Sequence, residues 1–280
     1  MDSVARARPD GARRTLAYGA AVLATAVFAF PIYWMVISSL KSDSDVAVWP
    51  PRFLFAPTFH SYKQLFTELD AGKALYNSAL IVGLATGFAM MAGTLAAYAL
   101  ARFEVNNKTF IAFEVLSIRM LPPMVSVIPL FMIAKALGVF DTPWLLIAIY
   151  TLNGLPFVVW VMRVFIQEIP QSIEEAAMID GCSRFETFWR ITLPLLVPGL
   201  AATMVIIFMF AWNEYLLASI LTSSDAKTLP VIAASAIKPK AISWGLASAA
   251  GVLMSLPVVI LVLLMQKYLV RGLTLGAVKG

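Results

Sequence analysis

The chain has 280 residues, of which 60% are apolar and only 13% charged, and its net charge is +5. A soluble domain carries about 25% charged residues, so this composition indicates a membrane protein. The modest charge without a dense basic run argues against a nucleic-acid partner. One cysteine, Cys182, excludes an internal disulfide, and its spacing from the lone His60 fits no metal site, so we expect none.

Six apolar segments are long enough to cross a bilayer, because a hydrocarbon core of about 30 Å needs about 20 apolar residues in a helix. The predicted fold class is therefore all-α, a polytopic membrane protein with six transmembrane helices. The first segment is too long for a cleavable signal peptide, and no small-residue cleavage site follows it. In chain order the predicted spans are residues 16–40, 74–101, 108–134, 142–166, 194–220 and 245–270.

The Lys and Arg residues in the loops, in the termini and near the ends of the spans set the predicted orientation. Twelve of them fall on the side that holds both termini, and eight on the other. Because cytoplasmic loops are enriched in Lys and Arg, this bias favours cytoplasmic termini. The loop at residues 167–193 then lies in the cytoplasm, and the loops at 41–73 and 221–244 lie outside.

Polar residues interrupt the third and fourth predicted spans. Glu114 and Arg119 are five residues apart, so they do not share a helix face. Ionisable groups in a membrane need partners; each of these two either pairs with another helix or subunit or belongs to a solute pathway. In the fourth span, Gly154 and Pro156 weaken the helix beside Asn153. This break indicates either a kink that lines the pathway or a plain packing kink.

A charged stretch, residues 174–195, separates the fourth and fifth spans. Two capping boxes are predicted there, because a serine is followed three residues later by a glutamate in each case. The first pairs Ser172 with Glu175, and the second pairs Ser183 with Glu186.

The caps predict two short helices, at residues 173–180 and 184–191, with Gly181 in the left-handed conformation that ends the first. Pro194 then opens the fifth span, where its missing N–H costs nothing. Helices this short persist only when they pack against something. The pattern therefore favours a docking element over a solvated connector at the membrane surface.

The fifth span carries a polar and aromatic group near its outer third. Hydrogen-bonding groups beside aromatic faces are what an uncharged sugar requires, so a solute pathway is one interpretation. Interfacial anchoring of the aromatic residues, with polar contacts to a neighbouring helix, is the other. Together with Asn153, the candidate pathway residues are Trp212, Asn213, Glu214 and Tyr215.

The sequence contains no Gly-x-x-x-x-Gly-Lys-Ser/Thr motif, so the chain is not expected to bind ATP phosphates itself. No nucleophile motif or metal-ligand cluster stands out either. An integral membrane enzyme therefore has no catalytic residues to support it.

The loop contains, in order, Glu175-Ala176-Ala177, Asp180-Gly181 and Leu193-Pro194. This order, between the fourth and fifth of six spans, resembles the EAA loop of ATP-binding-cassette importer permeases. Residues 96–102 and 210–215 are similar to the second and fifth spans of that family. The C-terminal residues 272–280 resemble the tail of the second permease of maltose-type carbohydrate importers.

The resemblance implies a type I importer permease fold and a coupling helix that docks into a cytoplasmic ATPase. It implies a second homologous permease, two ATP-binding-cassette ATPases that hold ATP and Mg, an extracytoplasmic solute-binding protein and a sugar or polyol-type solute. No cofactor is expected on this chain. The implied location is a bacterial or archaeal cytoplasmic membrane. The coupling residues it implies are Glu174, Glu175, Ala176, Ala177, Asp180, Gly181, Leu193 and Pro194, and the tail residues implied to contact the ATPases are Gly276, Lys279 and Gly280.

The predicted organisation is a flexible cytoplasmic arm at residues 1–15, a permease domain at 16–270 with its core at 72–268, and a cytoplasmic tail at 271–280. The alternative function is an ion-coupled secondary carrier. Such carriers show inverted repeats with paired broken helices and buried acids. The sequence offers one interrupted helix and no clear second copy.

Overall fold

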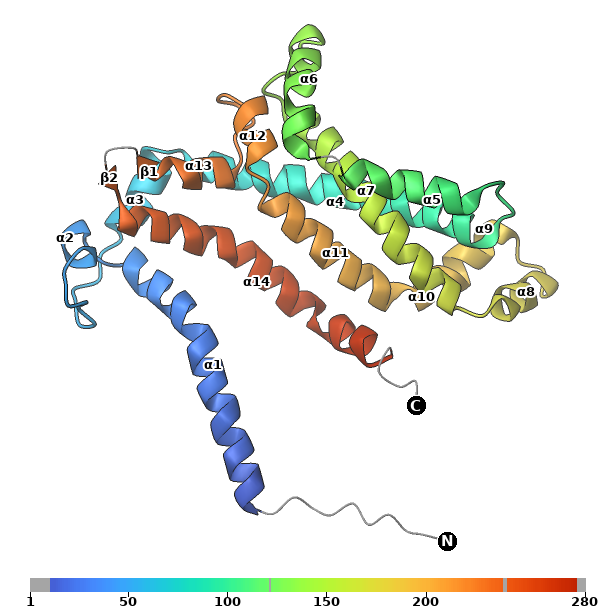
Figure 1. Ribbon diagram of the computed structural model, residues 1–280, viewed down its shortest axis with the longest axis horizontal. Coiled ribbons are helices and arrows are strands. Elements are labelled where there is room, and N and C mark those ends of the chain that lie inside the picture. The colour runs from blue at the N-terminus through green and yellow to red at the C-terminus, as the bar shows by residue number, and fades with distance from the viewer. Residues whose placement is uncertain (1–10, 121, 239–240, 276–280) are drawn as a thin grey trace. The chain divides into compact units, whose positions relative to one another are not determined.

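The computed structural model describes residues 11–120, 122–238 and 241–275 (Figure 1). The chain forms two compact units, one made of residues up to 68 with residues 236–253, and one of residues 69–235 with the remainder. We describe each unit by itself.

The first unit contains α1 (Gly11–Ser39), α2 (Asp43–Val46), α3 (His60–Thr67), a two-stranded antiparallel hairpin and the beginning of α14 (Trp244–Leu275). The hairpin pairs β1 (Ile237–Lys238) with β2 (Ala241–Ile242). Because α1 already starts at Gly11, residues 11–15 of the predicted N-terminal arm are helical. Gly251 leaves room for Met35, whose Sδ would lie 2.8 Å from an added Cβ, so α1 and α14 approach closely here.

A buried lysine anchors the loop that follows α1. Lys41 is only 2% exposed, and its Nζ lies 4.6 Å from the ring centroid of Trp34 and 5.2 Å from that of Phe55. Cations are attracted to aromatic faces at such distances. The two aromatic rings therefore stabilise the buried charge of Lys41.

The second unit is built around α4 (Ala71–Arg102) and α7 (Pro143–Glu168), which pack against each other and against α11 (Val197–Trp212). Thr142 caps α7 by accepting a hydrogen bond from the Leu145 N–H at 3.4 Å. Small residues on α4 permit the close approach, since a Cβ on Gly93 would lie 2.7 Å from Val158. The buried core between these helices comprises Ala89, Met90, Ala97, Val158, Met162, Ile166, Leu196 and Ile207.

The remaining elements of this unit are short. They are α5 (Lys108–Ser117), the 3-10 turn η1 (Ile118–Met120), α6 (Pro123–Ala136), α8 (Gln171–Ile179), α9 (Arg184–Thr187), the π-helix η2 (Phe188–Thr192), α10 (Leu193–Leu195), α12 (Leu216–Leu221) and α13 (Leu229–Ser235). The end of α14 completes the unit. α14 continues to Leu275, so residues 272–275 of the predicted C-terminal tail are helical. Gly276, Lys279 and Gly280 lie outside the described residues.

In the described part of the chain, four helices are long and apolar enough to cross a membrane, and two bent helix pairs raise the number to six if each pair is one span. The six predicted spans are confirmed in this sense, as is the all-α class, since the only strands described are the two of the short hairpin. The breaks differ from the prediction. α7 runs through Gly154 and Pro156 as one helix, whereas the third span bends by 86° before Pro123 and the fifth by 73° near Leu196.

One carboxylate organises the loop between α12 and α13. Asp141, at a φ of +58°, accepts hydrogen bonds from the backbone N–H groups of residues 223–226 at 2.9–3.2 Å and from the hydroxyls of Ser223 and Ser224. Partial burial alone raises the pKa of Asp141, but the hydrogen bonds from Ser223, Ala226 and Asp225 outweigh it and hold this pKa well below its usual range.

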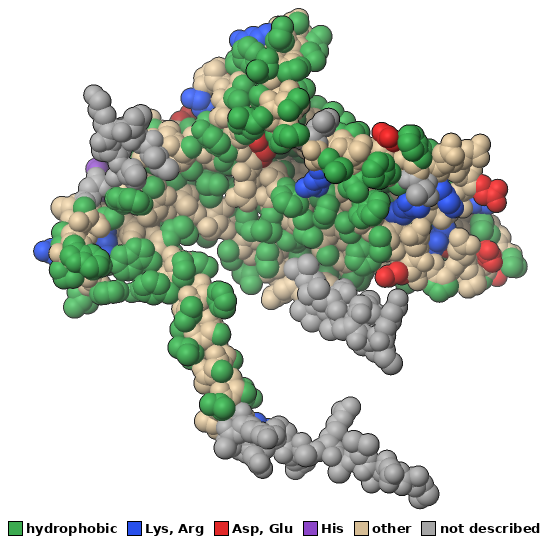
Figure 2. All heavy atoms as spheres, viewed as in Figure 1, with side chains coloured by type: hydrophobic (Ala, Val, Ile, Leu, Met, Phe, Trp, Pro, Cys, Tyr) green, Lys and Arg blue, Asp and Glu red, His purple; other side chains and the backbone are tan. Residues whose placement is uncertain are grey.

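Apolar side chains cover most of the face drawn in Figure 2, as expected for surfaces that contact lipid or other apolar chains. Charged side chains gather instead at the end of the second unit that carries α8 and α9. The structure thus places the loop predicted to dock at the polar end of an apolar helix bundle.

Candidate functional site

The loop between α7 and η2 is shaped by a proline and a glycine. Pro170 is the N-cap of α8, and no side chain caps the helix. The predicted Ser172–Glu175 capping box is therefore wrong, because α8 starts at Gln171 and places Ser172 inside its first turn. The other end follows the prediction: Gly181 has a φ of +95°. The Gly181 N–H donates to the Met178 carbonyl at 3.1 Å and the Cys182 N–H to the Ala177 carbonyl at 3.0 Å, which is a Schellman motif.

The second predicted capping box is confirmed. The Glu186 N–H donates to Ser183 Oγ at 3.3 Å, and the Ser183 N–H donates to Glu186 Oε2 at 3.0 Å. The hydrogen bonds from the Ser183 backbone and hydroxyl, followed by the nearby Arg190, lower the pKa of Glu186. The helix expected at residues 184–191 begins at Arg184 as predicted, but it changes to a π-helix at Phe188.

Glu174 lies inside this loop and is bound by its own chain. Arg102 Nε donates to both of its carboxylate oxygens at 3.0 Å, Thr192 Oγ1 donates to Oε1 at 2.9 Å and Tyr98 OH donates to Oε2 at 3.3 Å. Arg102 Nη2 also donates to the carbonyls of Ile166 and Ile169 at 2.9 and 2.8 Å. The two charged side chains are 6% and 7% exposed.

This buried network joins four elements. Arg102 is the last residue of α4, the two carbonyls belong to the end of α7 and the residue after it, Glu174 is on α8, and Thr192 ends η2. A buried ion pair with its donors and acceptors satisfied fixes geometry more than it adds stability. The network therefore ties the loop to the ends of the two central helices.

The residues predicted for ATPase coupling divide into two groups. Glu175, Ala176, Asp180, Gly181 and Pro194 are exposed, Leu193 is partly exposed, and Glu174 and Ala177 are buried. Glu174 therefore faces its own chain, whereas Glu175 and Asp180 present carboxylates that a partner can reach. Large apolar side chains extend the exposed group: Ile179, Phe185 and Trp189 are 86%, 70% and 46% exposed.

Arg102 and Thr192 were not among the residues predicted for the site. Arg102 follows the apolar run of the second span directly, and a cation at the end of a span has the ordinary role of facing the membrane surface. Its partner on α8 is 72 residues away in the chain. Only the packing of α4 against α7 brings the two together.

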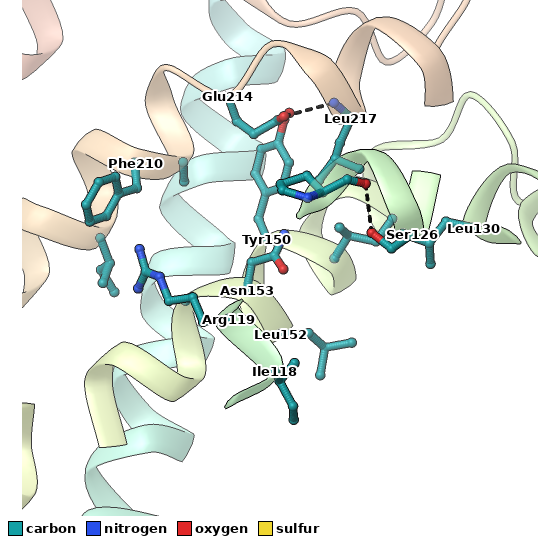
Figure 3. A pocket seen from close by; sticks show the side chains of 15 residues that line it. Ile118, Arg119, Ser126, Leu130, Tyr150, Leu152, Asn153, Phe210, Glu214 and Leu217 are labelled. Atoms are coloured by element: carbon teal, nitrogen blue, oxygen red, sulfur yellow. Dashed lines mark hydrogen bonds between the residues drawn. The ribbon is translucent and has the colours of Figure 1, made fainter. Parts of the chain in front are cut away.

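A cavity of about 410 Å³ lies among α6, α7, α11 and η1 (Figure 3). Its volume falls within the range of small-molecule sites, about 300–1,000 Å³. Glu214 is held in its wall by three donors, namely Tyr150 OH at 2.9 Å, the Leu217 N–H at 2.8 Å and the Ala218 N–H at 3.1 Å. The side chains that line the cavity include Arg119, Ser126, Tyr150, Asn153, Phe210 and Glu214.

Two of the five predicted pathway residues, Asn153 and Glu214, line this cavity, and the other three do not. Trp212 is 1% exposed, stacks on Phe208 with a centroid distance of 5.4 Å and donates to the Met254 carbonyl at 2.9 Å, so its ring is closed off from a solute. Asn213 donates to the Met209 carbonyl of its own helix, and Tyr215 is 48% exposed.

The structure also places Glu114 and Arg119, the two charged residues of the third predicted span. Glu114 is exposed, and Arg119 stacks on Phe157 and Phe210 at the cavity, with its guanidinium carbon 5.0 and 4.8 Å from the ring centroids. The described ion pairs include neither residue. A pairing of each with another helix of this chain is therefore not seen in the part of the chain that the structure describes.

Apolar spans, a cavity at the bend of the third span and a capped polar loop are together typical of a membrane permease rather than a soluble enzyme. Residues 89–275 match the family of binding-protein-dependent transport system inner membrane components, and the chain belongs to this family. It is thus a permease subunit in the inner membrane and not an enzyme. This confirms the resemblance drawn from the EAA loop and leaves the ion-coupled carrier without support.

Several relatives span nearly the whole chain. A probable ABC transporter permease, y4oR of Sinorhizobium fredii, is 36% identical over 90% of this chain and 91% of its own. The trehalose/maltose transport system permease MalG of Thermococcus litoralis is 35% identical over 98% of this chain and 99% of its own. The trehalose transport system permease SugB of Mycobacterium tuberculosis is 36% identical over 96% and 100%.

A solved structure supports the fold. A chain of a bacterial ABC transporter involved in the import of the acidic polysaccharide alginate has a TM-score of 0.74 at 20% identity, with 94% of this chain and 99% of that chain covered. At this identity the likeness shows the fold alone. It agrees with the importer permease fold expected from the sequence.

Proposed function

We propose that this chain is one of two permease subunits of an ATP-driven importer for a sugar or a related polyol-type solute. Its relatives over nearly the full length are named as trehalose, maltose or related sugar permeases. The solute is released by an extracytoplasmic binding protein and crosses by alternating access. A second homologous permease forms the other half of the pathway.

Two copies of a separate ATP-binding-cassette ATPase supply the energy, with ATP and Mg bound on them. They dock on the exposed face of α8, where Glu175, Ala176, Asp180 and Gly181 are accessible. The buried Glu174–Arg102 pair supports this proposal most directly, because a loop fixed to the ends of α4 and α7 passes a displacement on to both helices. A loosely attached loop would absorb the displacement instead.

The proposed topology places both termini and residues 167–193 in the cytoplasm, with the loop at 221–244 outside. The proposed permease domain covers residues 16–270, with its core at 72–268. The tail at 271–280, through Gly276, Lys279 and Gly280, provides a further contact with the ATPases.

Site-specific cross-linking in the complete complex tests the docking face. Cys182 is first replaced by serine, and a single cysteine is then placed at Glu175 or, as the control, at Ser235, which is exposed at the end of α13. A short bifunctional reagent is expected to join position 175 to the ATPase and leave position 235 unjoined. Position 235 is expected to react with a membrane-impermeant maleimide from outside. Equal cross-linking from both positions, or none from position 175, contradicts the proposal.

A further inference from the structure

A cation that forms no ion pair in the described part of the chain lies in the cavity of the proposed solute pathway. Arg119 belongs to η1, at the bend of the third span just before Pro122 and Pro123. Within residues 11–120, 122–238 and 241–275, its guanidinium takes part in no hydrogen bond or ion pair. Its contacts are the faces of Phe157 and Phe210. Figure 3 shows its side chain extended toward Phe210 at the edge of the cavity.

The two aromatic rings hold the cation in place and leave its donors open. Phe157 is on α7 and Phe210 on α11, and their rings meet edge to face with a centroid distance of 6.2 Å. Stacking on ring faces restrains a guanidinium but uses none of its five N–H donors. Arg119 is exposed in the chain, so these donors remain accessible.

The carboxylate in the same cavity does not serve as the partner. Glu214 already accepts hydrogen bonds from Tyr150 OH and from the N–H groups of Leu217 and Ala218. It lies just past the end of α11, four residues after Phe210, and no ion pair within 4.0 Å joins it to Arg119 in the described part of the chain. The cavity therefore contains an anion whose hydrogen bonds are satisfied and a cation whose donors are not.

The position of Arg119 within a membrane span carries a free-energy cost that an anionic ligand would lower. A charge within a membrane span is expensive and marks a pathway or a partner, and broken helices in transporters surround solute sites. The planar guanidinium fork matches the oxygens of a carboxylate or a phosphate. Arg102 illustrates the contrast, because its donors are taken up by Glu174 and two carbonyls.

We propose that Arg119 binds an oxyanion carried by the transported solute, so that this importer takes an anionic sugar, a sugar acid or a sugar phosphate. The hydroxyls of such a sugar have polar partners in Asn153 on α7 and Ser126 on α6, which also line the cavity. This inference rests on the proposed function and adds to it the charge class of the solute.

The test uses the complete importer in nanodiscs with its binding protein and measures the solute concentration that half-maximally stimulates ATP hydrolysis. The probes are glucose, galactose, glucuronate, galacturonate and glucose 6-phosphate. We expect an anionic sugar to act at lower concentration than its neutral counterpart, and the uronate and phosphate arms distinguish the source of the oxyanion. Arg119→Gln is expected to raise that concentration roughly 10- to 100-fold, the worth of hydrogen bonds to a charged group, and Arg119→Lys to raise it less.

Lys135→Gln is the matched control, because Lys135 makes the same kind of contact with an aromatic face, 3.7 Å from the Phe140 centroid, but does not line the cavity. It should leave the response unchanged. The inference is overturned if neutral sugars stimulate best, if Arg119→Gln affects neutral and anionic sugars alike, or if this variant loses the companion permease on purification, which would assign the cation to a subunit contact. If no sugar of either class stimulates hydrolysis, the result contradicts the proposed function as a sugar importer, and not only the charge class of the solute.

Chemical modification provides a readout that does not need a variant to fold. Phenylglyoxal labels accessible arginines, and the label at Arg119 is quantified by mass spectrometry in the wild-type complex. Glucuronate or glucose 6-phosphate is expected to protect Arg119 while equal concentrations of glucose do not. Labelling that no anionic sugar reduces contradicts the inference.

Discussion

Removing the carboxylate of Glu174 should destabilise the loop and weaken its attachment to the ends of α4 and α7. In Glu174→Ala, the Arg102 guanidinium stays buried with only the Ile166 and Ile169 carbonyls, and the hydroxyls of Tyr98 and Thr192 lose their acceptor. Breaking one partner of a buried ion pair costs about 3–5 kcal/mol. Because both side chains are more than nine-tenths buried, solvent does little to reduce this value.

The matched control is Glu175→Ala, at the exposed neighbouring position, which should change the free energy of unfolding by less than about 0.5 kcal/mol. A double replacement, Arg102→Met with Glu174→Leu, removes both charges and should recover most of the lost stability, since apolar residues of similar volume can replace a buried pair.

The assay measures thermal unfolding of the purified complex together with solute uptake per ATP hydrolysed. Glu174→Ala is expected to lower the unfolding midpoint by on the order of 10 °C and to lower the uptake ratio, while Glu175→Ala keeps the midpoint. If both single variants unfold at the wild-type temperature, or if the double variant is no more stable than Glu174→Ala, the buried pair does not secure the loop.

Three further predictions concern neighbouring features. Glu175→Lys and Gly181→Val should both reduce solute-stimulated ATP hydrolysis. The first reverses an exposed charge, and the second introduces a valine, which resists a φ of +95°. Unchanged hydrolysis and uptake in both variants would contradict the coupling role. Ser183→Ala should cost about 1 kcal/mol by removing the cap of α9, whereas Ser172→Ala should be close to neutral, and equal losses in thermal unfolding would contradict the cap geometry. Asp141→Asn should speed hydrogen exchange at the amides of residues 223–226. Because the folded pKa of Asp141 is depressed, its stabilising contribution is present above about pH 4 and lost as pH falls further. If the amides of residues 223–226 in the wild-type chain stay equally protected from exchange through that fall in pH, the ionised Asp141 does not hold this loop.

The features that could be read from the sequence are those set by local chemistry. Span lengths follow from runs of apolar residues, and Gly181 and the Ser183–Glu186 box follow from local backbone geometry, so these predictions agree with the structure. The Ser172 box is wrong although its residue types fit, because Pro170 is the N-cap of α8, two residues before Ser172. A capping pattern competes with every other helix start nearby.

The features that could not be read depend on tertiary packing. Pro156 is the kind of residue that breaks a helix, yet α7 continues through it while its neighbours are buried against α4. The third span breaks instead, beside Pro122 and Pro123, and this bend places Arg119 at the cavity. For Trp212 the sequence left a solute-pathway role and interfacial anchoring open, and the structure instead packs its ring on Phe208 inside the protein.

The most direct measurement of the central claim is solute uptake into proteoliposomes that contain either this chain alone or the complex with its companion permease, ATPases and binding protein. We predict no uptake by the chain alone under a proton or sodium gradient, and ATP-dependent uptake by the complex that stops when the ATPases are omitted. Gradient-driven uptake by the chain alone would contradict it and would restore the ion-coupled carrier.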